Sequence, residues 1–203
     1  MSITEKVTNR ILAVVLGFTF IYMVLLLTYS FITAFTARAE QSEVAIIVYT
    51  ELAKKVKEGK AFSSSKRFTL NAGESVSVLF NNKSDKTVVM VVAEVDVEGN
   101  VDIDIYDNVT VESSGNKWDI RNLNLGSSYM TNVEVEDGGT YTGGKLVHQT
   151  IGFGGKKNFA VGSLSEVGEG VYIPPNNNIL LKITNTTSSA VKISVRFIFY
   201  EGG

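Results

Sequence analysis

The stretch AVKISVRFIFYE, residues 190–201, alternates apolar and polar side chains more regularly than any other part of the chain. Its apolar positions fall at every second residue, namely Val191, Ile193, Val195, Phe197 and Phe199. Successive side chains of a β-strand point to opposite faces of the sheet, so this period of two predicts a strand with one buried face. The runs that precede it repeat the pattern, and together they decide the fold class as mainly β.

Further runs with the same period lie between clusters of Gly, Asn, Asp or Ser, which are typical turn residues. They are RFTLNA (67–72), SVSVLFNN (75–82), KTVVMVVAEVDV (86–97), NVDIDIYDNVTVE (100–112), KLVHQTIGF (145–153) and NILLKITNT (178–186). No helical periodicity follows residue 60. Short strands at this spacing are typical of two packed antiparallel sheets, and we predict an antiparallel β-sandwich, a jelly roll, over residues 61–203.

A different pattern precedes the strands, because residues 11–37 form an apolar run without one charged side chain. About 27 residues at roughly 1.5 Å each exceed the ~30 Å hydrocarbon core of a bilayer, so the run predicts a transmembrane helix after a short tail of residues 1–10. The apolar part of a cleavable signal is shorter, which favours an uncleaved anchor. The residues expected inside the membrane include Ile11, Phe18, Tyr22, Leu26, Tyr29 and Phe35.

The charges beside this run favour one orientation. Lys6 and Arg10 precede it, whereas Arg38 on the other side is followed by Glu40 and Glu43. The positive-inside rule therefore favours a single-pass protein with its N-terminus inside and its β-domain outside a virion membrane or a cell membrane.

Residues 38–60 predict an amphipathic helical stalk. One apolar face recurs at spacings of three and four residues, formed by Val44, Ile47, Val48, Leu52 and Val56. This stripe has two interpretations, which the sequence leaves open. It either packs on the chain's own β-domain or associates with the same stripe in other copies.

Composition argues against several classes of function. The formal net charge is −2, so we expect no basic surface that would recruit nucleic acid. Cysteine is absent and His148 is the single histidine, which argues against thiolate metal sites and His-based catalytic triads. The glycine-rich stretch GFGGKK (152–157) lacks the spacing of a phosphate-binding loop. We predict a protein that is not an enzyme and needs no cofactor.

The stretch EVDVEGNVDIDIYD, residues 94–107, alternates Val or Ile with acidic residues. A hairpin with a three-residue loop would keep one face apolar, and it would place Glu94 opposite Asp104 and Asp96 opposite Asp102. Facing carboxylates repel each other unless a cation lies between them. The expected acidic ridge therefore has three interpretations: a site for a cation such as Ca²⁺, a contact with a basic neighbouring subunit, or a solvated surface.

Two long segments, residues 126–144 and 154–172, are rich in Gly, Ser and Tyr. Loops of this kind on a rigid sandwich often carry binding functions. They are either tolerated surface insertions or contacts with a neighbouring virion or surface protein, a host receptor or a glycan. Trp118 is either an exposed contact residue or part of the core.

Two blocks of the sequence resemble a family of small jelly-roll virion proteins of tailed phages and related viruses. They are VDIDIYDNVTVESSGNKWDIRNLN (101–124) and VYIPPNNNILLKITNTTSSAVKISVRFIFYE (171–201). The resemblance covers roughly residues 66–201. It implies a structural or surface-display role in a virus particle, and it carries no active-site residues. The family has no membrane helix, so the anchor is a departure from its pattern.

The order of elements also resembles archaeal pilins and archaellins, in which an apolar N-terminal helix precedes a β-sandwich. Those proteins carry a short basic leader that ends in a small residue, whereas Asn9 and Arg10 precede the apolar run here. We therefore expect a membrane-anchored structural protein of a virus particle that assembles in many copies. The alternative is an extracellular filament subunit with a helical core and an outer β-domain.

Overall fold

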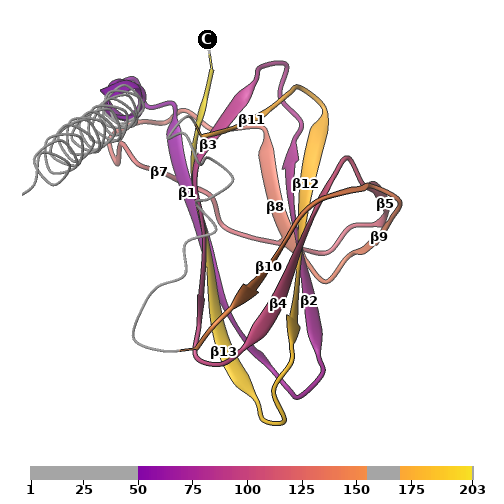
Figure 1. Ribbon diagram of the computed structural model, residues 1–203. Helices are drawn as coiled ribbons and strands as arrows, with labels where there is room; N and C mark the ends of the chain where they lie inside the picture. The colour runs from indigo at the N-terminus through magenta and orange to yellow at the C-terminus, as the bar shows by residue number, and fades with distance from the viewer. Residues whose placement is uncertain (1–49, 155–169, 203) are drawn as a thin grey trace, which may run out of the picture. The chain divides into compact units, whose positions relative to one another are not determined.

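The computed structural model describes residues 50–154 and 170–202, which form a β-sandwich preceded by one short helix over residues 50–57 (Figure 1). Its strands are β1 (Ala61–Leu70), β2 (Ser75–Asn82), β3 (Val88–Val97), β4 (Val101–Asp107), β5 (Thr110–Ser113), β6 (Asn116–Lys117), β7 (Arg121–Asn122), β8 (Val133–Asp137), β9 (Thr140–Thr142), β10 (Lys145–Gly152), β11 (Val171–Ile173), β12 (Asn177–Asn185) and β13 (Val191–Glu201). The prediction of a mainly β antiparallel sandwich is confirmed.

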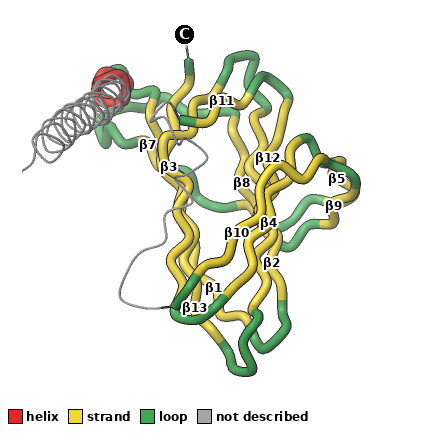
Figure 2. Tube along the Cα trace, in the orientation of Figure 1, coloured by secondary structure: helices red, strands yellow, loops and turns green. Residues whose placement is uncertain are grey.

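The strands form two main sheets that face each other as layers (Figure 2). One sheet has the order β11-β3-β13-β1-β7, and the other has the order β10-β4-β12-β2-β8-β6. The first arm of the chain, β1 to β4, pairs strand for strand with the last arm, because β1 pairs with β13, β2 with β12, β3 with β11 and β4 with β10. Two antiparallel arms wound together between two sheets have the strand order of a jelly roll.

The core lies between the two sheets and follows the period of two that the sequence shows. In β13 the predicted inward residues Val191, Ile193, Val195, Phe197 and Phe199 are all at most 5% exposed. Rings from both sheets meet there, since Phe80 packs edge-on against Phe197 and Phe199 at centroid distances of 5.5 and 5.0 Å. Each fully buried aromatic or aliphatic side chain contributes about 1.5–3 kcal/mol, so the alternation itself specifies the buried face.

Buried asparagines hold the strand ends together. The Nδ2 atom of Asn185 lies 2.8–3.0 Å from the carbonyl oxygens of Leu70, Asn71 and Ser189. At the other end of the sandwich, the Nδ2 atom of Asn82 lies 2.8–3.0 Å from three further carbonyl oxygens, including that of Ile173. A buried amide with several partners satisfies turn carbonyls that would otherwise lose their hydrogen bonds to water.

The predicted hairpin of residues 94–107 is wrong in its pairing. β3 belongs to the sheet of β13, whereas β4 belongs to the sheet of β12, so the connection over residues 98–100 crosses from one layer to the other. The buried faces are as predicted, because Val95, Val97, Val101 and Ile103 all point into the core. The alternation specifies which face of each strand is buried, but a hairpin and a crossing between facing sheets bury the same residues.

The helix of residues 50–57 lies in one compact unit with the sandwich. Its Leu52 and Val56 pack against a cluster of Ala61, Val89 and Tyr200 on the outer face of the first sheet. This is the first of the two interpretations of the apolar stripe. Val44, Ile47 and Val48 lie outside the described residues, and self-association through them stays a prediction.

Across residues 50–154 and 170–202, no helix has the length and apolar character needed to cross a bilayer. The predicted span of residues 11–37, with Ile11, Phe18, Tyr22, Leu26, Tyr29 and Phe35, lies outside the part of the chain that the structure describes.

Candidate functional site

The insertion between β4 and β10, residues 108–144, closes one edge of the sandwich. Its β7 extends one main sheet beside β1, and its β8 and β6 extend the other sheet beside β2. Its remaining strands, β5 and β9, form a two-stranded sheet that covers Leu79 and Leu180 on the outer face of the second main sheet. The insertion therefore reaches both layers and builds a surface that the eight jelly-roll strands alone do not provide.

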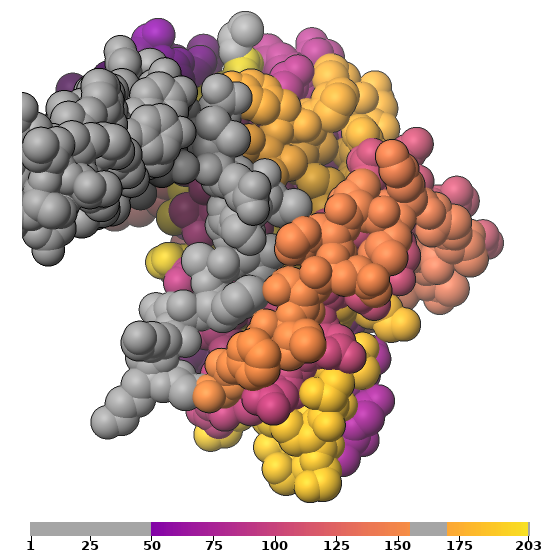
Figure 3. Space-filling model, in the orientation of Figure 1, coloured from indigo at the N-terminus to yellow at the C-terminus, as the bar shows by residue number. Residues whose placement is uncertain are grey.

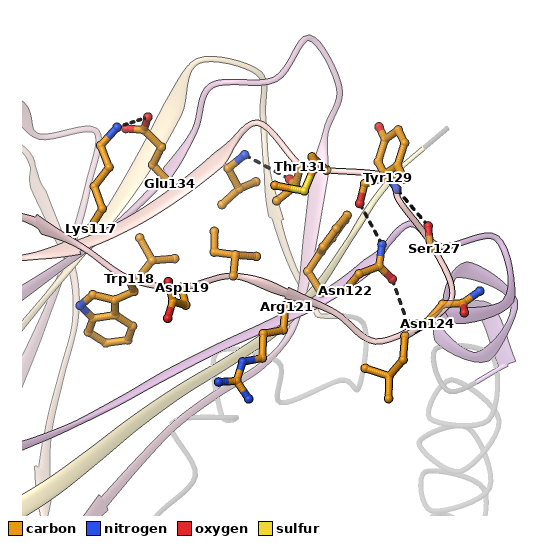
Figure 4. Close-up of a pocket in the computed structure, with 16 residues that line it drawn as sticks. Lys117, Trp118, Asp119, Arg121, Asn122, Asn124, Ser127, Tyr129, Thr131 and Glu134 are labelled. Atoms are coloured by element: carbon orange, nitrogen blue, oxygen red, sulfur yellow. Dashed lines mark hydrogen bonds and ion pairs between the residues drawn. The ribbon is translucent and has the colours of Figure 1, made fainter.

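A pocket of about 570 Å³ lies in this insertion, between residues 117–131 and β8 (Figure 4). Its apolar wall consists of Phe62, Trp118, Ile120, Val133 and Val135. Its polar lining includes Lys117, Asp119, Arg121, Asn122, Asn124 and Glu134. An apolar wall with a few fixed polar groups is the usual composition of a binding site.

Glu134 sits at one end of the pocket between two lysines. It accepts hydrogen bonds from the Nζ atoms of Lys117 at 2.6 Å and Lys83 at 2.5 Å. These bonds lower the pKa of the Glu134 carboxyl below its ordinary value, and the bond to Glu134 raises the pKa of Lys117. Glu134 is therefore a fixed anion and is poorly suited to accept a proton near neutral pH.

Asparagine side chains shape the opposite end of the pocket. The Nδ2 atom of Asn122 donates to the carbonyl oxygen of Gly59 at 2.6 Å and to that of Tyr129 at 3.1 Å. Its Oδ1 atom accepts from the backbone N–H of Asn124 at 2.9 Å. Asn122 thereby joins the loop of residues 123–131 to the turn that follows the helix, and this loop has a defined conformation.

This loop exposes large apolar side chains on the pocket rim. Leu125 is 95% exposed and Met130 is 81% exposed. Apolar side chains held so far out of the core contribute nothing to the fold of the monomer, and they are typical of contact surfaces. The sequence named the Gly/Ser/Tyr-rich segment 126–144 as a contact candidate, but it gave no signal for Leu125.

Glu201 fixes the base of the same loop. It is 2% exposed, and it accepts hydrogen bonds from Tyr129 Oη at 2.5 Å and from Thr131 Oγ1 at 2.8 Å. The bond to Glu201, with a smaller effect of burial, raises the pKa of Tyr129 to about 12. The Tyr129 hydroxyl is thus a committed donor to Glu201.

Trp118 belongs to the core, which decides between the alternatives that the sequence left open. It is 8% exposed, and its ring lies 5.8 Å from that of Phe68 and 6.1 Å from that of Phe197. Its indole N–H donates to Asp137 Oδ1 at 3.1 Å. A sugar-stacking role requires an exposed ring face, and Trp118 offers little of one.

The predicted acidic ridge is divided between the two sheets, so a cation site formed by all of these residues is wrong. Glu94 and Asp96 lie on β3, whereas Asp102 and Asp104 lie on β4 in the other layer. Within the part of the chain that the structure describes, no group of three or more Asp, Glu or His residues is placed to hold a metal ion.

Two of these four carboxylates have protein partners instead. Glu94 forms an ion pair with Arg196 of the neighbouring β13, and Asp104 accepts a hydrogen bond from Gln149 Nε2 at 2.8 Å. The Oδ1 atom of Asp96 is buried and has no hydrogen-bond partner among the described residues. The charge alternation of the sequence therefore reflects the outer faces of two separate sheets.

Comparison with known proteins gives no family for this chain. No protein-family model matches the sequence, and no curated protein sequence matches it. Similar solved structures include the Yersinia pseudotuberculosis-derived mitogen (YPM), with a TM-score of 0.32 and 10% identity over 66% of this chain and 83% of that chain. They also include PirA, with a TM-score of 0.29 and 12% identity over 68% of this chain and 93% of that chain. A third is the VP1 pentamer of Human Polyomavirus 7, with a TM-score of 0.28 and 9% identity over 70% of this chain and 95% of that chain.

Proposed function

We propose that this protein is a membrane-anchored structural component of a virus particle, which displays its β-sandwich on the outer side and assembles in many copies. One observation carries the proposal. The jelly-roll arms pair strand for strand, and a helix packed on the sandwich joins them to a preceding chain that contains a long uncharged apolar run. The proposed role is structural and not enzymatic.

The attachment of the helix supports a display role. Leu52 and Val56 bury part of their surface on the sandwich, and the carbonyl oxygens of Gly59 and Lys60 accept hydrogen bonds from Asn122 Nδ2 and the backbone N–H of Glu201. The chain therefore enters the domain through a fixed connection. In the proposed display role, this helix is the point at which the preceding chain reaches the sandwich.

The insertion supplies the proposed contact surface for partners outside the membrane. The pocket and its rim at Leu125 and Met130 combine exposed apolar area with Arg121 and Asp119. Such a surface suits another virion or surface protein, a host receptor or a glycan. The formal net charge of −2 disfavours nucleic acid as a partner.

Vesicle flotation with protease protection tests this proposal. The full chain, synthesised in the presence of lipid vesicles, is floated on a density gradient, washed with alkaline carbonate and treated with protease. We expect the chain to float, to resist the alkaline wash and to leave a short protected fragment that contains residues 11–37. A chain that remains at the bottom of the gradient, or that alkaline carbonate removes from the vesicles, contradicts the anchor.

A further inference from the structure

The two main sheets end in four edge strands, and one of these differs from the others in length. β6 and β7 have two residues each and β11 has three, whereas β10 has eight. An edge strand presents a row of unpaired backbone N–H and C=O groups, and short edges limit the pairing of these groups with other chains. β10 is the longest of these four edge strands. Among the described strands, β7 and β11 also leave residues 64–70 of β1 and 91–97 of β3 without a partner on one side.

β10 also exposes apolar side chains. Leu146, Val147 and Ile151 are 42%, 47% and 48% exposed, and Phe153, just after the strand, is 64% exposed. Figure 3 shows the orange residues of this part of the chain on the molecular surface. Edge strands are commonly protected by charged residues, proline or β-bulges. β10 has no proline and one charged residue, Lys145, at its first position, and its irregularity lies between Leu146 and His148, before Gln149. Its composition therefore favours pairing.

Side-chain direction restricts how β10 can pair with a copy of itself. Gly152 is buried, and His148 and Thr150 point toward the core side, because their partners Ile105 and Ile103 on β4 are fully buried. Gln149 and Ile151 point outward. In an antiparallel sheet, residues directly opposite each other point to the same face, whereas neighbours along one strand point to opposite faces. A two-fold axis must therefore pair one residue with its own counterpart in the second copy, and it cannot pair a residue with the counterpart of its neighbour.

We propose that β10 pairs antiparallel with β10 of a second copy, about a two-fold axis at Gln149. This register places Thr150 opposite His148 of the second copy and Ile151 opposite Val147 of the second copy, the residue at which β10 bulges in its pairing with β4. It places Lys145 opposite Phe153 of the second copy, so no like charges face each other, and a cation can lie against an aromatic ring. An axis at His148 would instead place Ile151 opposite Lys145.

A second copy is the occupant that this strand fits best, because both halves of the paired surface come from one self-complementary sequence. A continuous sheet across the axis satisfies the open backbone groups and covers Val147 and Ile151 in each copy. The inference rests on the proposed assembly of many copies and identifies a surface that mediates it.

The absence of cysteine from the chain allows a direct test by disulfide crosslinking. Opposite Cα atoms in an antiparallel pair are roughly 4.5–5.5 Å apart, which lies within the range that a disulfide spans. The full-length Gln149→Cys variant, in membranes or mild detergent, is treated with a mild oxidant and followed on non-reducing gels. Ser65→Cys, an exposed position on the outer face of the other sheet, measures random collision.

We expect Gln149→Cys to form covalent dimers at least tenfold faster than Ser65→Cys. Adding Ile151→Lys should slow this reaction at least fivefold, whereas the matched charge change Thr69→Lys on the other sheet should not. A mixture of Val147→Cys chains with Ile151→Cys chains should crosslink, and each variant alone should not, because like positions lie about 13 Å apart along the strands.

The inference is overturned if Gln149→Cys crosslinks no faster than Ser65→Cys, or if Ile151→Lys leaves its rate unchanged. These results are separate from the test of the anchor. If the chains float with vesicles but fail to crosslink, the β10 interface is refuted and the anchor is not. If the chains crosslink in detergent but do not insert into vesicles, the anchor is refuted and the β10 interface is supported.

Discussion

Lys66 and Asp137 join the two sheets at the edge that the insertion closes. The Nζ atom of Lys66, on β1, lies 2.5 and 2.8 Å from the two carboxylate oxygens of Asp137, on β8. Asp137 also accepts the indole N–H of Trp118, and its side chain is 8% exposed. One carboxylate thus connects a strand of each layer with the single tryptophan.

Removal of this carboxylate should destabilise the domain. Asp137→Ala leaves the Trp118 indole N–H and the Lys66 ammonium without their acceptor, and we expect a loss of about 2–4 kcal/mol in the free energy of unfolding. Denaturant titration followed by Trp118 fluorescence measures the loss, because this is the only tryptophan.

Glu134→Gln is the matched control, because Glu134 pairs with two lysines that are at least half exposed. It should cost less than about 1 kcal/mol. Equal losses for the two variants would show that the Asp137 contact is no stronger than a surface ion pair.

Replacement of Asn185 should loosen the turns at one end of the sandwich. Asn185→Ala removes the amide that faces three carbonyl oxygens and the acceptor of the Thr187 backbone N–H. Because Asn185 is 1% exposed, we expect a loss of about 2–4 kcal/mol in the free energy of unfolding. Thr186→Ala, which removes one exposed bond to Asn100, should cost less than about 1 kcal/mol. A loss for Asn185→Ala as small as this control would contradict the assignment.

The helix of residues 50–57 should stabilise the domain. A fragment of residues 50–203 keeps the contacts of Leu52 and Val56, whereas a fragment of residues 61–203 exposes Val89 and Tyr200. We expect the longer fragment to be more stable by about 2–3 kcal/mol, as measured by thermal or denaturant unfolding. Leu52→Ala in the longer fragment should give part of this loss, and Lys54→Ala, on the exposed side of the helix, should give little. Equal stability of the two fragments would show that the helix contacts are incidental.

Tyr129 should ionise at unusually high pH. Its hydrogen bond to Glu201 raises its pKa to about 12 from an ordinary value of 10, so the folded state favours the neutral phenol. The stability that this contact provides is complete below pH 10 and is lost as the pH rises from about 10 through about 12.

Phenolate absorbance of the wild type minus that of Tyr129→Phe isolates this group from the other tyrosines. Glu201→Gln should return the difference titration toward pH 10. A wild-type difference titration already centred at pH 10 would contradict the Tyr129–Glu201 contact.

The period of two predicted most of the fold because burial of one strand face dominates the energetics of a sandwich. It identified the inward residues of β13, β3 and β4 by position. It did not specify that Val97 and Val101 belong to different sheets, since both arrangements bury the same side chains. The pairing is decided by contacts between distant strands, such as β3 with β13, which a local pattern does not contain.

The proposed contact surface was predictable only in part. Gly, Ser and Tyr marked the segment that carries Tyr129 and Met130, because these residues suit exposed turns. The pocket also needs Phe62 from β1 and Val133 from β8, and the insertion brings them together only after the sheets form. The edge position of β10 likewise follows from strand order, and its sequence resembles that of the other strands.

Cryo-electron microscopy of the assembly purified with the full chain tests the central proposal most directly. We expect a bilayer that carries β-sandwich domains on its outer face, with the chain crossing the lipid once and the N-terminus inside. Filaments without lipid, in which the N-terminal helices form a central core, would contradict it and would support an extracellular filament subunit instead.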